Sequence, residues 1–305
     1  MPQTAPDRRR PTADKTLLEA ALRWGQACLR DADVESPRGD ARLLLAAALG
    51  LSPGELMMAG ECTLTPAELR GFDALIERRC RREPVSRILG RREFWSLDLA
   101  ITPSTLDPRP DSETLVEAVL GRIEDHDRPQ WVLDLGTGSG NLLLAVLAAL
   151  PAAWGVGLDR DTAALAAAAR NAGRLGLAGR AAFVASDWGA ALAGNWDVIL
   201  CNPPYVRTGD IGGLAPEVAR FEPRAALDGG SDGLEAYRRV VPEVARLLAP
   251  DGLAALELGA GQAATVAGLA RDQGLEPRDC LPDLAGIQRC LLLGHQRGRQ
   301  KGSRR

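Results

Sequence analysis

The second half of the chain alternates short apolar runs with stretches that are apolar on one side only. The apolar, β-branched runs predict strands at residues 131–135, 154–158, 181–185, 196–201, 252–257, 275–281 and 288–293. Apolar positions at helical spacing predict helices near residues 139–150, 161–175, 234–249 and 260–273. This alternation indicates an α/β fold with a doubly wound, mostly parallel sheet. Because the last two strands are joined without a helix, we expect them to form an antiparallel pair at the sheet edge.

The region before this alternation is helical. Apolar residues recur at helical spacing from Leu17 to Leu29 and again after Ser36. Ser52 and Thr65 each precede a proline and stand three residues before a glutamate, which is typical of a capping box. We therefore predict a small helical bundle over residues 15–83.

Basic residues gather at the end of this bundle. They are either a solvated helix end or a surface that docks a partner protein or an RNA, and the sequence leaves both open. The residues are Arg78, Arg79, Arg81 and Arg82.

Between the two regions, residues 84–110 are expected to form a hairpin and a linker, because residues 86–102 alternate in polarity and several prolines follow. The α/β domain is then expected over residues 111–295. The polar stretches 1–14 and 296–305 are expected to be disordered tails.

Composition narrows the classes of function. A chain of 305 residues suggests about two domains, and its net charge of −3 does not favour nucleic acid as a partner. The six cysteines form no C-x-x-C pair and only two histidines accompany them, so no metal site is expected. The amino terminus lacks a signal sequence, and the longest apolar run, residues 142–150, is too short for a membrane. We expect a cytoplasmic protein with no membrane partner.

The sequence Asn202-Pro203-Pro204-Tyr205 follows the predicted strand 196–201. Two prolines cannot continue a strand, so an amide and a tyrosine are placed in a loop at its carboxyl end. Open α/β sheets bind their ligands at this edge. An isolated Asn-Pro pair is more often an ordinary turn, so the interpretation depends on what the other strand ends carry.

A glycine-rich loop follows the first predicted strand of the sheet. Its glycines recur at every second position and are preceded by an acidic residue, whereas a dinucleotide fingerprint would have a glycine at Asn141. This spacing fits S-adenosyl-L-methionine, which has a cationic sulfonium and no pyrophosphate, better than it fits NAD. The candidate donor-binding residues of this loop are Asp134, Gly136, Thr137, Gly138, Ser139 and Gly140.

Acidic residues also end the next two predicted strands. Asp159 is placed to accept the ribose hydroxyls of an adenosine, and Asp161 remains to cap the following helix. Asp187 is a candidate acceptor for the adenine amino group, and Trp188 either covers the adenine ring or packs in the core. The strand ends together suggest a methyl donor held beside a planar nitrogen.

Several of these stretches resemble the release factor glutamine N5-methyltransferases, and the resemblance extends over most of residues 15–293. The Asn-Pro-Pro-Tyr sequence alone does not identify this family, because DNA adenine and ribosomal-RNA guanine methyltransferases share it. The helical amino-terminal region and Arg220–Pro223 are the features that distinguish the release factor enzymes from these. The resemblance rests on Arg109–Glu113, Asp134–Gly140, Asp159–Arg160, Ser186–Trp188, Asn202–Tyr205, Arg220–Pro223 and Asp283–Gly286.

The resemblance implies a Rossmann-like sheet of seven strands, with S-adenosyl-L-methionine as methyl donor and S-adenosyl-L-homocysteine as product. It implies that the acceptor is a glutamine side chain of class I peptide chain release factors, in translation termination, and that the bundle docks this substrate. It also implies that Gly136–Gly140, Asp159, Trp188 and Asn202 contact the donor, and that residues 202–205 hold the glutamine.

The residue types suit this reaction. Both hydrogens of a glutamine amide are donors, and the Asn202 side-chain oxygen and the Pro203 carbonyl are two adjacent acceptors that would fix its nitrogen. Pro204 and Tyr205 would pack on the faces of the planar amide. Catalysis would then be mainly positioning, with Asn202, Pro203 and Tyr205 as the expected catalytic residues.

Two other classes of function remain open at this point. A nucleic-acid base N-methyltransferase could use the same loop, but it would be expected to carry a basic recognition domain. A non-catalytic ribosome-binding or RNA-binding protein could have the same fold, but the intact donor loop argues against it.

Overall fold

The computed structural model describes residues 16–60 and 62–296, so the expected tails, apart from Gln296, lie outside the described residues. The chain forms two compact units. One contains the described residues up to Gly90 together with Pro216–Phe221, and the other contains Arg91–Ala215 and the described residues from Glu222 onward. We call them the amino-terminal unit and the sheet unit. The division after Gly90 falls inside the range 84–110, whereas the inclusion of residues 216–221 in the first unit was not predicted.

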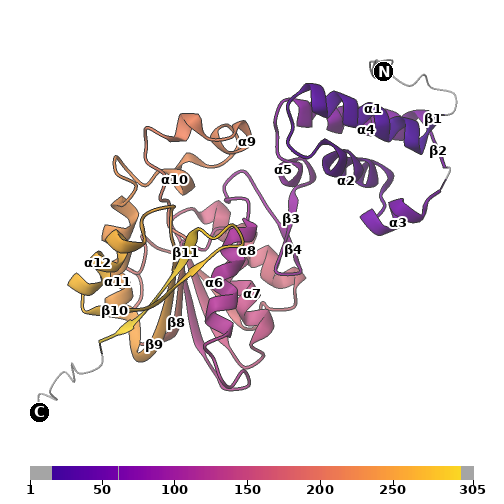
Figure 1. The fold of residues 1–305 in the computed structure, drawn as a ribbon. Coiled ribbons are helices and arrows are strands. Elements are labelled where there is room, and N and C mark those ends of the chain that lie inside the picture. The colour runs from indigo at the N-terminus through magenta and orange to yellow at the C-terminus, as the bar shows by residue number, and fades with distance from the viewer. Residues whose placement is uncertain (1–15, 61, 297–305) are drawn as a thin grey trace, which may run out of the picture. The chain divides into compact units, whose positions relative to one another are not determined.

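The amino-terminal unit is mostly helical, and all of it apart from the segment with α9 is drawn in indigo to purple in Figure 1. Both predicted capping boxes are present. The Ser52 side chain accepts the backbone N–H of Glu55, and the Glu55 side chain accepts the backbone N–H of Ser52; Thr65 and Glu68 are bonded in the same way. Its core is apolar, with Phe72 fully buried. The elements are β1 (Thr16–Leu17), α1 (Leu18–Asp31), α2 (Pro37–Leu49), α3 (Pro53–Met58), β2 (Thr63–Leu64), α4 (Pro66–Cys80), α5 (Val85–Leu89) and α9 (Pro216–Ala219).

The arginines at the end of α4 are bound within this unit. Arg79, which is buried, donates to Asp40 at 2.7 Å and to Glu217 at 2.9 Å. Arg82 makes two further hydrogen bonds to Glu217, at 2.7 and 2.8 Å. Arg78 likewise pairs with a glutamate just beyond the helix. These ion pairs attach the segment that contains α9 to the bundle.

The sheet unit begins with the expected hairpin, although the helix α5 precedes it within the predicted linker range. The elements are β3 (Arg91–Phe94), β4 (Leu97–Ala100), η1 (Pro110–Ser112), α6 (Glu113–Leu120), β5 (Trp131–Leu135), α7 (Asn141–Ala149), β6 (Trp154–Asp159), α8 (Thr162–Arg174), β7 (Ala181–Ala185), β8 (Trp196–Cys201), η2 (Ile211–Gly213), α10 (Arg224–Leu227), α11 (Glu235–Leu247), β9 (Leu248–Glu257), α12 (Ala263–Asp272), β10 (Leu275–Pro282) and β11 (Gln288–His295).

The predicted fold class is confirmed. The large sheet has seven strands in the order β10-β11-β9-β8-β5-β6-β7. Strands β9, β8, β5, β6 and β7 pair in parallel, and β11 runs antiparallel to both of its neighbours. The edge strand β10 therefore forms the expected antiparallel pair with β11.

Helices cover both faces of this sheet, with α6, α7 and α8 on one side and α11 and α12 on the other (Figure 1). Successive strand residues face opposite sides, as the period of two requires. Val132 and Val198 belong to the core under α6 and α7, while their neighbours Leu133 and Ile199 belong to the core under α11. Because both faces are buried, the strands are apolar throughout, and polar residues are concentrated where the strands end.

Candidate active site

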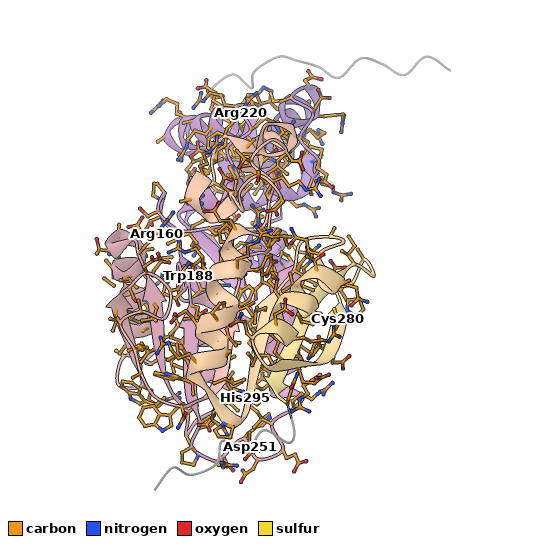
Figure 2. The ribbon with its side chains drawn as sticks, turned by 90° about the vertical axis from the view of Figure 1, so that its left-hand side faces the viewer. Arg160, Trp188, Arg220, Asp251, Cys280 and His295 are labelled. Carbon is orange, nitrogen blue, oxygen red and sulfur yellow. The ribbon has the colours of Figure 1, made fainter. Side chains whose placement is uncertain are left out.

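The carboxyl ends of the parallel strands surround an open cavity of about 740 Å³. This volume is within the usual range for a small-molecule site. Figure 2 shows Arg160 and Trp188 toward this edge of the sheet, and Asp251 and His295 toward the opposite edge. The lining comes from the loops after β5, β6, β7 and β8, with further residues from the loops before α6 and α11.

The loop after β5 is shaped by its glycines. Gly136, Gly138 and Gly140 have φ values of +79°, +54° and +82°, which residues with a Cβ rarely adopt. A Cβ added to Gly138 would meet no atom within 4 Å, so this part of the backbone is open to a ligand. Gly140 does not line the cavity, and an added Cβ there would lie 3.1 Å from Leu144. Gly140 thus serves packing against α7.

Asp134 is among the residues that line the cavity and is almost fully buried. The hydroxyl of Thr137 donates to its carboxylate at 2.7 Å. Burial raises the pKa of the Asp134 carboxyl to about 7, because the charged form loses its hydration. A cation bound beside it would stabilise the ionised form.

Asp159 is the last residue of β6 and lines the cavity. Its carboxylate accepts the backbone N–H of Gly138 and that of Asp161, each at 2.9 Å. Asp161 caps α8, as expected, by accepting the N–H groups of Ala163 and Ala164. Asp159 therefore connects two loops of the site and keeps acceptor capacity for a ligand, since a carboxylate can accept about four hydrogen bonds.

Asp187 and Trp188 both line the cavity, in the loop that follows β7. The Trp188 ring lies 3.4 Å from where a Cβ on Gly136 would stand, and the rest of the side chain packs on the core under α11. Trp188 thus packs in the core and also lines the cavity, where covering the adenine ring remains its predicted role. Asp187 is exposed, and its carboxylate pairs with Arg239 in α11.

Asn202 follows Cys201, the last residue of β8, and also lines the cavity. Its side-chain Nδ2 donates to the hydroxyl oxygen of Ser112 at 3.2 Å. Pro204 lines the cavity as well, whereas Pro203 is buried and neither it nor Tyr205 contributes to the lining. The loop therefore presents Asn202 and Pro204 to a ligand, and holds Pro203 and Tyr205 behind them.

Tyr205 is turned toward a buried carboxylate. Its hydroxyl donates to Glu257 Oε1 at 3.0 Å, and the hydroxyl of Ser112 donates to Glu257 Oε2 at 2.5 Å. Burial raises the pKa of Glu257, while the two hydroxyl donors and the charge of Arg289 oppose that shift. Burial also raises the pKa of the Tyr205 phenol, which keeps it a donor.

Ser112 and Glu257 were not among the residues predicted for the site. Ser112 directly precedes α6, but its side chain makes no capping hydrogen bond because it is bonded to Glu257 and Asn202. Glu257 was detectable as the single charge in the apolar run Leu253–Leu258, at the carboxyl end of a strand.

The backbone that follows Asn202 is fixed on the segment before α11. Val206 accepts the N–H of Gly229 at 2.8 Å, and a Cβ added to Gly229 would lie 2.8 Å from the Cα of Tyr205. Gln262 donates to the Tyr205 carbonyl at 3.1 Å. Such close backbone packing requires glycine at 229 and leaves the loop little freedom.

Two further stretches that carry the family resemblance also make structural contacts here. The side chain of Glu222 is fully buried, accepts the Asp107 N–H at 3.1 Å and pairs with Arg109 at 2.9 Å. Asp283 accepts two N–H groups of its own turn and pairs with Arg289, which is also buried. Glu222 thus holds the loop before Ser112 in place, and Asp283 holds the turn between β10 and β11.

Comparison with known proteins agrees with this geometry. Residues 20–90 match the family model of the PrmC N-terminal domain, and residues 110–217 match the Methyltransferase small domain. A release factor glutamine methyltransferase of Rhodospirillum rubrum is 54% identical over 276 residues, which cover 90% of this chain and 84% of that protein. The one from Bradyrhizobium diazoefficiens is 45% identical over 277 residues, 90% of this chain and 93% of that protein.

Among solved structures, the catalytic domain of hMettl16 in complex with a 3'UTR hairpin has a TM-score of 0.53 at 18% identity. The match covers 72% of this chain and 80% of that one, and it shows the fold alone.

The sheet order, the cavity at its carboxyl edge and the matching domain model define the class: the protein is a methyltransferase. Relatives that share about half of its residues over nine-tenths of its length define it more narrowly. The chain belongs to the release factor glutamine methyltransferase family. Within residues 16–60 and 62–296, the structure has no helix with the length and apolarity needed to span a membrane.

Proposed function

We propose that this protein transfers a methyl group from S-adenosyl-L-methionine to the side-chain amide nitrogen of a glutamine in class I peptide chain release factors, in the cytoplasm. The observation that carries the proposal is the position of Asn202, which lines the same cavity as the glycine loop and Asp159. A planar amide on one side of this cavity and a methyl donor on the other would lie within reach of each other.

The residues present fit the donor. The open backbone at Gly138 provides a surface on which a ligand can lie close to the chain. Asp159 offers acceptors for ribose hydroxyls, and Trp188 a flat apolar surface at the cavity wall. Asp134 offers a negative charge to a cationic group. When bound, the donor supplies a methyl group that its sulfonium has already activated, so the protein needs no strong base.

The acceptor amide has to be oriented rather than deprotonated. Its two hydrogens are donors, and the Asn202 Oδ1, on a residue that lines the cavity, is the acceptor that we assign to one of them. Holding the amide in this way aims the nitrogen lone pair at the methyl group, and positioning of this kind lowers the barrier by several kcal/mol.

The function is tested by incubating the purified protein with labelled S-adenosyl-L-methionine and, separately, with release factor and with nucleic acid. We expect label in the release factor alone, at one glutamine. Label in nucleic acid and none in release factor would instead support the base N-methyltransferase alternative.

Donor affinity is expected to rise with pH through about 7, the pKa to which burial raises Asp134. Below that pH the carboxyl is neutral, and above it the carboxyl is ionised and attracts the cationic donor. The dissociation constant measured by calorimetry should fall by up to about tenfold across the two pH units centred on this pKa. In the matched variant Asp134→Asn the dissociation constant should not vary with pH. The same pH profile in that variant would assign the effect to another group.

We also propose that the amino-terminal unit docks the release factor. The arginines of α4 bind Glu217 in α9. In the chain, α9 lies between Tyr205 and Glu222, and both of these residues make contacts around the cavity.

A chain that begins at Arg91 should bind the donor as the full chain does, but should methylate intact release factor at least roughly tenfold less efficiently, since binding energy from the docked partner is lost. Calorimetry and a thermal melt of the same preparation verify the fold. Full activity of this fragment on intact release factor would rule out the docking role.

A further inference from the structure

The side chains behind Asn202 form a chain of hydrogen bonds with a fixed direction. Asn202 Nδ2 lies 3.2 Å from Ser112 Oγ, which lies 2.5 Å from Glu257 Oε2. Tyr205 OH lies 3.0 Å from Glu257 Oε1. Glu257 and Ser112 are each 1% exposed, so both side chains are largely shielded from bulk water.

The direction follows from the inventory of protons. When Glu257 is ionised its carboxylate can only accept, so Ser112 and Tyr205 then each donate their one hydroxyl proton to it. The two hydroxyl donors and the charge of Arg289 favour this ionised form, against the effect of burial. Having given its proton to Glu257, Ser112 Oγ can only accept from Asn202. The Asn202 amide must therefore turn its NH₂ group toward Ser112.

We propose that Glu257 is a positioning residue which, through Ser112, fixes the orientation of the Asn202 amide and so presents its Oδ1 as the acceptor for the substrate. A planar amide whose nitrogen is held on one side has its oxygen on the other, and Asn202 lines the cavity. With the opposite orientation, an NH₂ group would face the two donor hydrogens of a glutamine amide, which is repulsive. This inference rests on the proposed function, because it assumes an amide acceptor.

Two alternatives predict different behaviour. If Glu257 and Ser112 only stabilise the fold, their removal should lower the melting temperature and affect turnover regardless of what stands at position 202. If they act through Asn202, their removal should have no further effect on turnover once the Asn202 amide is absent.

The test is a double-mutant cycle between Ser112→Ala and Asn202→Ala, with single-turnover methylation of release factor as the readout. Ser112→Ala alone is expected to lower turnover about tenfold, because it frees the amide to rotate. Asn202→Ala alone should lower it about a hundredfold. The double variant should match Asn202→Ala within about threefold, whereas independent effects would multiply to about a thousandfold. An independent, multiplied effect would overturn the proposal.

A second pair of variants tests the carboxylate itself. Glu257→Gln replaces one acceptor oxygen by an NH₂ donor, so in a fraction of the molecules the hydrogen bonds through Ser112 to Asn202 can run in the opposite direction. Turnover should therefore fall severalfold, while the KM for release factor changes little. The matched control is Glu243→Gln on α11, where the carboxylate pairs with Arg246 on the same helix, and it should keep the parent turnover. Ser112→Thr restores the hydroxyl and should recover most of the turnover that Ser112→Ala loses. Equal turnover of Glu257→Gln and its control would contradict the assignment.

Donor affinity by calorimetry is measured for every variant, and retention of the parent value shows that the cavity has kept its shape. If Ser112→Ala does not fold, the same cycle is run between Glu257→Gln and Asn202→Ala. Failure of the parent chain to methylate release factor would refute the proposed function. Failure of the cycle in an active parent would refute only the role of Glu257.

Discussion

Asn202→Ala is expected to lower the rate of methylation on the order of a hundredfold or more, in line with loss of a single catalytic hydrogen-bonding group. The reason is that Asn202 holds the substrate amide in the orientation needed for transfer, and such an interaction is strongest in the transition state. Turnover should therefore fall more than affinity for release factor. Donor affinity should change much less, and the melting temperature hardly at all, because a loop residue supports little of the core.

Asn202→Asp is a sharper variant because it keeps the shape of the side chain. It removes the Nδ2 group that donates to Ser112, and it places a negative charge near the hydrogen bond between Ser112 and the Glu257 carboxylate. The cationic donor can bind more tightly while the acceptor amide is aligned less well. Single-turnover methylation, calorimetry and a thermal melt on the same preparations separate these effects. Turnover of Asn202→Ala within about threefold of the parent would show that this loop is not the amide-holding site.

Asp159→Ala is expected to weaken donor binding at least tenfold. Hydrogen bonds to a charged acceptor contribute roughly 1.5–3 kcal/mol each, and the ribose of the donor would lose two of them. The carboxylate also holds the N–H groups of Gly138 and Asp161, so its loss loosens the glycine loop as well.

The matched variant Asp159→Asn separates the two contributions. It keeps the size of the side chain and one acceptor oxygen, and so should retain part of the loop geometry while losing the charge. Its donor affinity is expected to lie between those of the parent and Asp159→Ala. A dissociation constant unchanged by either substitution would make Asp159 a purely structural residue.

The periodicity of the sequence was sufficient to predict most of the fold. Strands buried on both faces leave uninterrupted apolar runs, and the helices between them leave apolar stripes, so the alternation could be recognised without structural information. Capping boxes at Ser52 and Thr65 were predictable because they involve residues only three positions apart. The positions of residues at strand ends, such as Asp159 and Asn202, were predictable for a similar reason. A residue that ends or follows a parallel strand lies at the carboxyl edge of the sheet.

Contacts between distant parts of the chain could not be predicted in this way. Ser112 directly precedes α6 and serine commonly caps helices, but a buried carboxylate 145 residues away accepts the Ser112 hydroxyl proton instead. Asp187 follows a strand like the other acidic residues, and its exposed carboxylate also pairs with Arg239 in α11, a contact that the sequence did not indicate. In both cases the partner side chain is brought near only by the tertiary structure.

The segment that contains α9 has a consequence for how the protein folds during synthesis. Arg79 is buried and is bonded to Glu217, which is 138 residues further along the chain. When the ribosome has made the bundle up to Gly90, that carboxylate does not yet exist. Domains generally fold as units, amino-terminal first, as the chain emerges. This bundle is an exception in one respect, because its last ion pairs form only after most of the sheet strands have been translated. A nascent chain arrested before residue 216 should therefore carry a bundle that is folded but less stable than in the finished protein.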